Sequence, residues 1–175
     1  MKCTDLLIRE HRTIQRALAV LEEMANRVNA GQEVAPEHVE SILRFLKIFA
    51  DDHHQAKEES ALFPELMRAP CAQEHAFRQM LFEHDQERSL VEALEDALYT
   101  KHRDEFVFFA NRFVTLIRNH IHKEDDILFQ HVDRCLSPEQ DTRVVAEFER
   151  YQLKPEVMAD LQRLESIYTG KEIRV

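Results

Sequence analysis

The sequence predicts an all-α protein, an up-down-up-down antiparallel four-helix bundle with a short C-terminal helical appendage. Its 175 residues suffice for one domain with an apolar core, and 44% of them are hydrophobic against 32% charged. Only 2 Gly and 5 Pro are present, too few for a turn-rich β fold. Apolar residues recur at helical spacing in four long segments joined by short connectors, a pattern typical of antiparallel bundles.

The first two helices are placed by residues that start and stop helices. The first is expected to be capped at residues 4–5 and to end at Gly31. Pro36 suits the first turn of the second helix, where its missing N–H costs no intrahelical bond, and this helix reaches Pro64. Because proline inside a helix removes a hydrogen bond, we expect a kink or an end near Phe63.

Two further long helices are expected at about 71–99 and about 103–136, each with apolar residues along one face. They complete a bundle domain that we assign to residues 1–136. Residues 137–175 should form a helical tail packed on that bundle. Its first helix starts at Ser137-Pro138-Glu139-Gln140, which resembles a capping box, and extends to about residue 152. Pro155 starts the last helix, which ends near Gly170.

Charge and cysteine usage exclude several classes of function. The net charge of -10 disfavours binding to nucleic acid or to anionic membranes. The N-terminal residues have no apolar signal core, and no apolar run approaches the roughly 20 residues that span a bilayer. Cys3, Cys71 and Cys135 are odd in number and far apart, and there is no CxxC, so we expect no zinc knuckle, no thioredoxin-type redox pair and no disulfide framework. A cytoplasmic location is expected, and the oligomeric state is left open.

A repeated segment contains the strongest chemical signal. The residues from His54 to Phe63 align with those from His120 to Phe129, and five positions match: His, Lys, Glu, Leu and Phe. Within the repeat, His54 and His120 each have a glutamate four residues later, Glu58 and Glu124. Positions i and i+4 lie on one helix face, so each imidazole and its carboxylate point to the same place. The repeat predicts a site with pseudo-twofold symmetry between two helical hairpins.

The other two long helices each add a histidine on the apolar side, His11 and His84. A lone histidine on an apolar stripe is ordinarily a core residue, but here one occurs on each of four helices. Burying these groups together without a metal would leave charges unpaired, at a cost of several kcal/mol per group. The sequence therefore predicts a metal site whose ligands are His11, His54, Glu58, His84, His120 and Glu124.

The types of ligand indicate which metal is expected. Imidazole and carboxylate without thiolate, in a bundle core, favour iron first and manganese or zinc next. Four imidazoles and two carboxylates cannot saturate two six-coordinate ions unless the carboxylates bridge them. Glu58 and Glu124 are the expected bridges. We therefore expect two iron ions, bridged by oxo or hydroxo, with open positions for a small ligand.

The order His, His-x-x-x-Glu, His, His-x-x-x-Glu, together with the segments HHQAKEESALFP and FEHDQER, resembles the hemerythrin family and its HHE cation-binding branch, over roughly residues 5–136. The resemblance implies terminal histidine ligands and bridging glutamates. Oxygen-carrying hemerythrins have His-x-x-x-His on the third helix, where this chain has Arg88, and His-x-x-x-x-Asp on the fourth, so Asp125 is an alternative to Glu124. His53 and His122 are weaker rivals as ligands.

Two classes of function follow. The first is a binding or sensing protein for oxygen, nitric oxide or iron availability. The alternative is a di-iron enzyme that consumes peroxide or nitric oxide. The missing fifth imidazole argues against reversible oxygen carriage, because an open iron tends to autoxidise. No nucleophile or dedicated acid/base is evident, since Glu83 and Asp85, which flank His84, are expected to be solvated.

Overall fold

The computed structural model describes residues 1–72 and 74–170, and in these ranges the chain forms helices and connectors without any strand. The prediction of an all-helical protein is confirmed. The parts of the expected helices and tail that fall on residues 73 and 171–175 lie outside the described residues.

Four long segments make up the body of the molecule. Two of them are continuous runs in which α-helix gives way to π-helix and then to α-helix again. In chain order, the segments are α1 (Cys3–Asn29); α2 (Pro36–Phe45) with η1 (Leu46–Gln55), η2 (Glu58–Leu62) and α3 (Phe63–Met67); α4 (Glu74–Thr100); and α5 (Arg103–Lys123) with η3 (Glu124–Leu128) and α6 (Phe129–Cys135).

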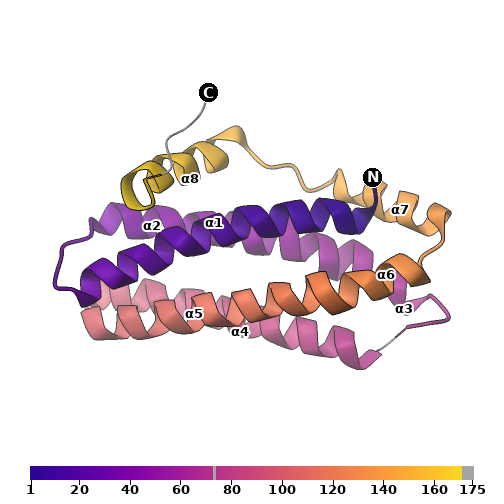
Figure 1. Cartoon of the computed structure of the whole chain (residues 1–175), viewed down its shortest axis with the longest axis horizontal. Coiled ribbons are helices and arrows are strands. Elements are labelled where there is room, and N and C mark those ends of the chain that lie inside the picture. Colours follow the sequence, from indigo (N-terminus) through magenta and orange to yellow (C-terminus); the bar gives the residue numbers. More distant parts are fainter. Residues whose placement is uncertain (73, 171–175) are drawn as a thin grey trace.

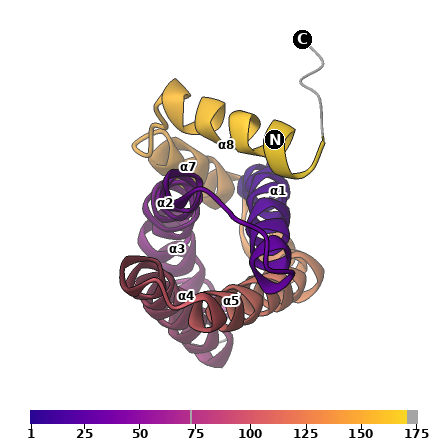
Figure 2. The ribbon, with the colours of Figure 1, turned by 90° about the vertical axis from the view of Figure 1, so that its left-hand side faces the viewer.

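The long segments lie alongside one another around a common axis. In Figure 1 the chain leaves α1 at the end of the molecule where α2 begins, and α3, α6 and α7 gather at the opposite end. Figure 2, which looks along the axis, shows the segments that begin with α1, α2, α4 and α5 at four corners. Side chains that point inward from all four corners can therefore meet on the axis.

Most helix boundaries fall close to the predicted ones. Gly31 follows α1 with a φ of 76°, the left-handed conformation that ends helices. The N-cap of α1 is Lys2, not residues 4–5, and the Asp5 carboxylate accepts a bond from the Lys2 backbone N–H. Pro64 stands in the first turn of α3, where it needs no N–H partner, so the segment changes helix type at Phe63 but continues to Met67.

The π-helical segments were not predicted, and two of them begin at the paired glutamates. Glu58 is the first residue of η2 and Glu124 is the first residue of η3. Short π-helical stretches are uncommon and often occur at functional sites, because the wider turn changes the direction of the side chains. The sequence repeat is thus matched by a repeat in backbone conformation at the same positions.

The core consists of two apolar clusters with a polar layer between them. One cluster joins α1, α2, η1, α4, α5 and α8, and the other joins α3, α6 and α7 to the first turns of α1 and α4. Along α1, Leu7 belongs to one cluster and Ile14 to the other, and His11 lies between them. The same change occurs along α4 between Met80 and Val91.

The C-terminal tail forms α7 (Pro138–Phe148) and α8 (Pro155–Tyr168). α8 packs across α1 and α2, as Figures 1 and 2 show, and the buried Glu165 carboxylate pairs with Arg16 of α1 at 2.5 Å. α7 ends at Phe148, before the expected residue 152. The division into two domains at residue 136 stays a prediction.

The cysteines give a correction. Cys71 and Cys135 are joined by a disulfide, whereas the odd number and wide spacing of the cysteines predicted no disulfide framework. The two residues are 64 positions apart, but the connector before α4 meets the end of α6, and this brings their Cα atoms within 6.0 Å. Within the described part of the chain, no helix combines the length and apolarity needed to cross a membrane.

The capping box predicted at the start of α7 is present. The Gln140 backbone N–H donates to Ser137 Oγ at 3.3 Å, and the Ser137 N–H donates to Gln140 Oε1 at 3.0 Å. Ser137→Ala should lower the free energy of unfolding by about 1 kcal/mol, because the Gln140 N–H at the helix start then loses its side-chain acceptor. Urea unfolding measures the change. Ser166→Ala, at an exposed position of α8, is the control, and an equal loss in both variants would contradict the role of the cap.

Candidate metal centre

The predicted ligands meet in the polar layer between the two apolar clusters. All of them are at most 3% exposed, and the two glutamates are 0% exposed. They come from all four long segments: His11 from α1, His54 and Glu58 from η1 and η2, His84 from α4, and His120 and Glu124 from α5 and η3.

The side chains form two groups that share the glutamates. One group contains His11 and His54, and the other contains His84 and His120, each together with Glu58 and Glu124. In each group, one potential ligand atom from every residue lies within 4.8 Å of the others, a spacing that suits a single ion. The two glutamates therefore stand between two places where a cation could be held.

Each shared carboxylate turns its two oxygens toward different groups. Glu124 Oε2 lies 3.1 Å from His11 Nε2, and Glu124 Oε1 lies 3.3 Å from His120 Nε2. Glu58 has the same arrangement, with Oε1 3.7 Å from His54 Nε2 and Oε2 3.5 Å from His84 Nε2. This is the orientation that a carboxylate needs to bridge two ions.

The central oxygens lack ordinary hydrogen bonds. Both oxygens of Glu58 and of Glu124 are buried without a hydrogen-bond partner among residues 1–72 and 74–170, and so is His11 Nε2. Leaving a buried carboxylate unsatisfied costs several kcal/mol. These atoms are the donor set that a pair of cations would satisfy, so the residues fit a metal centre.

The pKa values of the two central glutamates are shifted by their burial and by their charged neighbours. Burial, reinforced by repulsion from Glu124, raises the pKa of Glu58 well above its ordinary range. Burial also acts to raise the pKa of Glu124, but the nearby imidazoles of His120 and His11 overcome it, and the pKa is lowered. Without a cation, ionising both buried carboxylates is unfavourable because their negative charges repel each other. Positive metal ions between them would offset this repulsion.

A second set of carboxylates holds the four histidines from behind. Each imidazole presents Nε2 to the centre, and its Nδ1 lies 2.7–3.0 Å from a carboxylate oxygen on a different segment. The pairs are His54 with Glu10, His84 with Glu59, His120 with Glu83, and His11 with Asp125. A carboxylate on Nδ1 fixes the proton there and leaves the Nε2 lone pair free for a metal.

These contacts close a ring around the bundle. α1 supports a histidine of η1, η2 supports one of α4, α4 supports one of α5, and η3 supports one of α1. Two lysines that precede the central glutamates extend the symmetry, because Lys57 binds Glu10 and Lys123 binds Glu83. In the sequence a glutamate directly precedes both His11 and His84, as Glu10 and Glu83, and this was a signal for these contacts.

The structure places the rival residues away from the centre. Asp125 contacts Nδ1 of His11, whereas Glu124 faces both groups, which favours Glu124 as the bridge. His53 contacts Glu10 and Lys57 behind the site. His122 is exposed and pairs with an aspartate on the surface.

One expectation about α4 is corrected, and the position of Arg88 is now defined. Glu83 is buried and pairs with His120, so the expectation that it is solvated is wrong, although Asp85 is exposed. Burial acts to raise the pKa of Glu83, but hydrogen bonds from His120 and Lys123 lower it to about 2. Arg88 does not face the two ligand groups; its guanidinium binds Asp51, Asp85 and Glu59, and Glu59 is the carboxylate behind His84.

Sequence reasoning missed a further buried carboxylate beside the site. Glu87 is 3% exposed and accepts a hydrogen bond from Gln55, while its Oε1 has no partner in the described ranges. Oε1 lies 3.9 Å from His120 Nδ1. Glu87 and Gln55 line a cavity of about 10 Å³ together with His11, His54 and His120. The spacing of Glu87 from His84 resembles no ligand pattern, so nothing in the sequence pointed to it.

The comparison with protein families agrees with this geometry. The family model described as the hemerythrin HHE cation binding domain matches residues 3–132. The chain belongs to this family. No curated protein and no solved structure matches the chain significantly. The match spans all six predicted ligands and ends within α6, just before the tail.

The ring of supporting carboxylates gives a testable prediction. Glu83→Gln should weaken binding of Fe(II) about 10- to 100-fold, because the amide holds His120 less firmly and removes charge behind it. Competition with a coloured chelator measures the affinity. Glu92→Gln, the same change at an exposed position of α4, is the matched control. Equal affinities in Glu83→Gln and wild type would show that the contact does not support the ligand.

Proposed function

We propose that this HHE-family chain is a non-haem di-iron protein that binds a small diatomic ligand, oxygen or nitric oxide. The supporting observation is the orientation of Glu58 and Glu124, whose oxygens face two separate groups of imidazoles. In the proposal, His11 and His54 hold one ion, His84 and His120 hold the other, and the glutamates bridge them.

The proposal includes the topology of an up-down-up-down antiparallel bundle. It is supported by the sequence repeat, by the pairing of α4 with α5 and of α1 with α2, and by the course of the chain in Figure 1. Under this topology the two hairpins are related by a pseudo-twofold axis between Glu58 and Glu124. Each ion then receives one histidine from each helix of its own hairpin.

Iron is the proposed metal because the donors are imidazole nitrogens and carboxylate oxygens without thiolate. Two histidines and two bridging oxygens give each ion four protein donors, fewer than the six that iron accepts in octahedral geometry. When bound, iron supplies open coordination positions and a reversible one-electron change of charge. The protein's own residues orient the imidazoles, exclude bulk water and compensate the charge.

The space at the site suits a very small ligand. The cavity of about 10 Å³ beside the histidines is bounded by apolar Ile14, Ile117 and Ile121 as well as by polar groups. A cavity of this size holds about one water molecule. A partner of one or two heavy atoms is therefore favoured, and the net charge of -10 disfavours nucleic acid as a partner.

One observation favours the alternative, an enzyme that consumes peroxide. Burial raises the pKa of Glu87, and its unpartnered Oε1 lies beside the cavity. A carboxyl group in this position can hold a proton and pass it to a ligand in the cavity, which is a step that peroxide reduction needs and simple binding does not. The two functions therefore differ in what Glu87 does.

The first prediction concerns metal content. Protein made in iron-rich medium should hold about two iron atoms per chain, because two ligand groups share the central glutamates. Elemental analysis gives the count, and the oxidised protein should show the near-ultraviolet band of an oxo-bridged iron pair. One zinc per chain, or no metal, would contradict the di-iron assignment.

The second concerns the bridges. Glu58→Ala and Glu124→Ala should each lose both ions, because a bridge contacts both and its removal leaves two positive ions poorly compensated. His38→Ala and His102→Ala are controls, since both histidines lie outside the two ligand groups. Metal analysis after gel filtration decides the outcome. Retention of one tightly held ion would show that the glutamates are terminal ligands.

The third separates binding from turnover. Glu87→Gln should keep its iron but consume peroxide at least about tenfold more slowly if Glu87 passes protons. The Fe(II) protein is exposed in turn to oxygen, nitric oxide and peroxide, and absorption spectra are followed with time. Reversible spectra with oxygen or nitric oxide, and no peroxide consumption in either protein, support the binding function. Catalytic peroxide loss in wild type alone supports the enzyme.

A further inference from the structure

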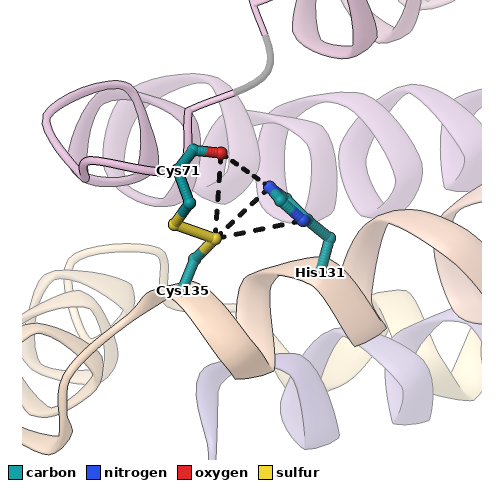
Figure 3. Close-up of side chains that lie close together, drawn as sticks. All are labelled: Cys71, His131 and Cys135. Atoms are coloured by element: carbon teal, nitrogen blue, oxygen red, sulfur yellow. Dashed lines mark hydrogen bonds between the residues drawn. A yellow bond between two sulfur atoms is a disulfide. The ribbon is translucent and has the colours of Figure 1, made fainter.

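Cys71, His131 and Cys135 form a second cluster of reactive side chains, at the end of the bundle. Cys71 lies in the connector that follows α3, and the other two residues are one turn apart on α6. Figure 3 shows the two sulfur atoms joined and the His131 ring beside them. All three side chains are partly exposed, and none belongs to the ligand groups of the proposed di-iron centre.

The imidazole is oriented by a backbone contact. His131 Nε2 lies 2.9 Å from the carbonyl oxygen of Cys71, to which its N–H donates. The same nitrogen lies 3.3 Å from Cys135 Sγ, so the ring edge that bears this proton also faces the sulfur. A protonated imidazole beside a cysteine stabilises its thiolate, which is the nucleophilic form. When the bridge is open, Cys135 is therefore the cysteine that the structure prepares for attack.

We propose that Cys71 and Cys135 are a reversible dithiol–disulfide site whose oxidant is a hydroperoxide. Cys135 is the attacking thiolate, Cys71 is the resolving thiol, and His131 is a positioning residue. The site is separate from the proposed di-iron centre and needs no metal.

The reaction balances in two steps. The Cys135 thiolate attacks the terminal peroxide oxygen; an S–O bond forms, the O–O bond breaks, and the leaving hydroxide or alkoxide takes a proton to become water or an alcohol. The sulfur is oxidised to a sulfenic acid and the peroxide is reduced. The Cys71 sulfur then attacks the sulfenic sulfur; the S–S bond forms, the S–O bond breaks, and the departing hydroxyl leaves as water. An external dithiol reverses the oxidation by thiol–disulfide exchange.

The third cysteine provides an internal comparison. Cys3 is 0% exposed in the apolar cluster at the same end of the bundle, and burial raises its pKa. It remains a protonated thiol without access to solvent. Oxidation should therefore be confined to the pair, and Cys3→Ala is a matched control that leaves the site intact.

Thiol counting tests the proposal. Iron-loaded protein is reduced with dithiothreitol, desalted without oxygen and treated with two equivalents of hydrogen peroxide, one for the two ferrous ions and one for the dithiol. Denatured samples should fall from three free thiols to one, and the Cys3→Ala control from two to none. Dithiothreitol should restore the starting count. Persistence of all three thiols in wild type, or disulfide-linked dimers in place of the internal bridge, would overturn the proposal.

Single variants test the separate roles. In Cys71→Ser, dimedone should trap a sulfenic acid on Cys135, while in Cys135→Ser the labelling of Cys71 should be at least about tenfold slower. Because Cys135→Ser lacks the proposed attacking thiolate, any oxidation of Cys71 that remains in this variant measures the contribution of peroxide chemistry at the iron. His131→Gln in the Cys71→Ser background should reduce the thiolate ultraviolet absorbance at neutral pH without moving the melting temperature. Equal labelling of both cysteines would contradict the assigned order of attack.

The same three side chains could instead hold a thiophilic cation, because their ligand atoms lie within 4.8 Å of one another. Adding zinc to the reduced protein distinguishes a metal site from a redox site. If one further zinc per chain binds, is lost in His131→Gln and blocks oxidation by peroxide, the cluster is a metal site and the redox proposal is wrong. Oxidation that proceeds at the same rate with zinc present supports the proposal.

Discussion

The structure is organised around two glutamates buried where water cannot reach them. Glu58 and Glu124 are 0% exposed, and their oxygens have no hydrogen-bond donor in the described part of the chain. A charge in that position is tolerated only if a positive partner balances it, since desolvation alone costs several kcal/mol. The four histidines, the supporting carboxylates and the two lysines behind them are all arranged around this requirement.

The ring of carboxylates explains how four separate helices hold one centre. Each supporting carboxylate is adjacent in sequence to a residue of the centre, yet it contacts the histidine of another segment. A movement of any one helix would therefore disturb both its own ligand and a neighbour's. The arrangement couples the geometry of the site to the packing of the bundle, and the apolar clusters on both sides keep that packing fixed.

The positions of Arg88 and Glu87 on α4 explain how this chain differs from the pattern of oxygen-carrying hemerythrins. Arg88 stands where those relatives have a fifth histidine, but it turns outward and secures Glu59, the carboxylate behind His84. Glu87, one residue earlier, turns inward to the small cavity. Glu87 thus places a carboxyl group beside the two ligand groups, and its handling of protons is the question that separates binding from catalysis.

The sequence by itself determined the helical class, the capping box at Ser137 and the residues that meet in the polar layer. These depend on periodicity and on i, i+4 spacing, which are local and can be counted along the chain. The choice of Glu124 over Asp125 was open in the sequence, because both lie within reach of His120 on a helix. Only the tertiary structure gives them different surroundings, since Glu124 faces both ligand groups whereas Asp125 contacts Nδ1 of His11 on another helix.

The tertiary structure alone also decided the solvation of Glu83, the inward position of Glu87 and the meeting of Cys71 with Cys135. Each depends on which helix end or face packs against another, a matter of long-range packing that no local spacing records. The π-helical turns at Glu58 and Glu124 belong to the same group. A buried carboxylate that must face two groups at once selects a backbone that ordinary helix propensity does not favour.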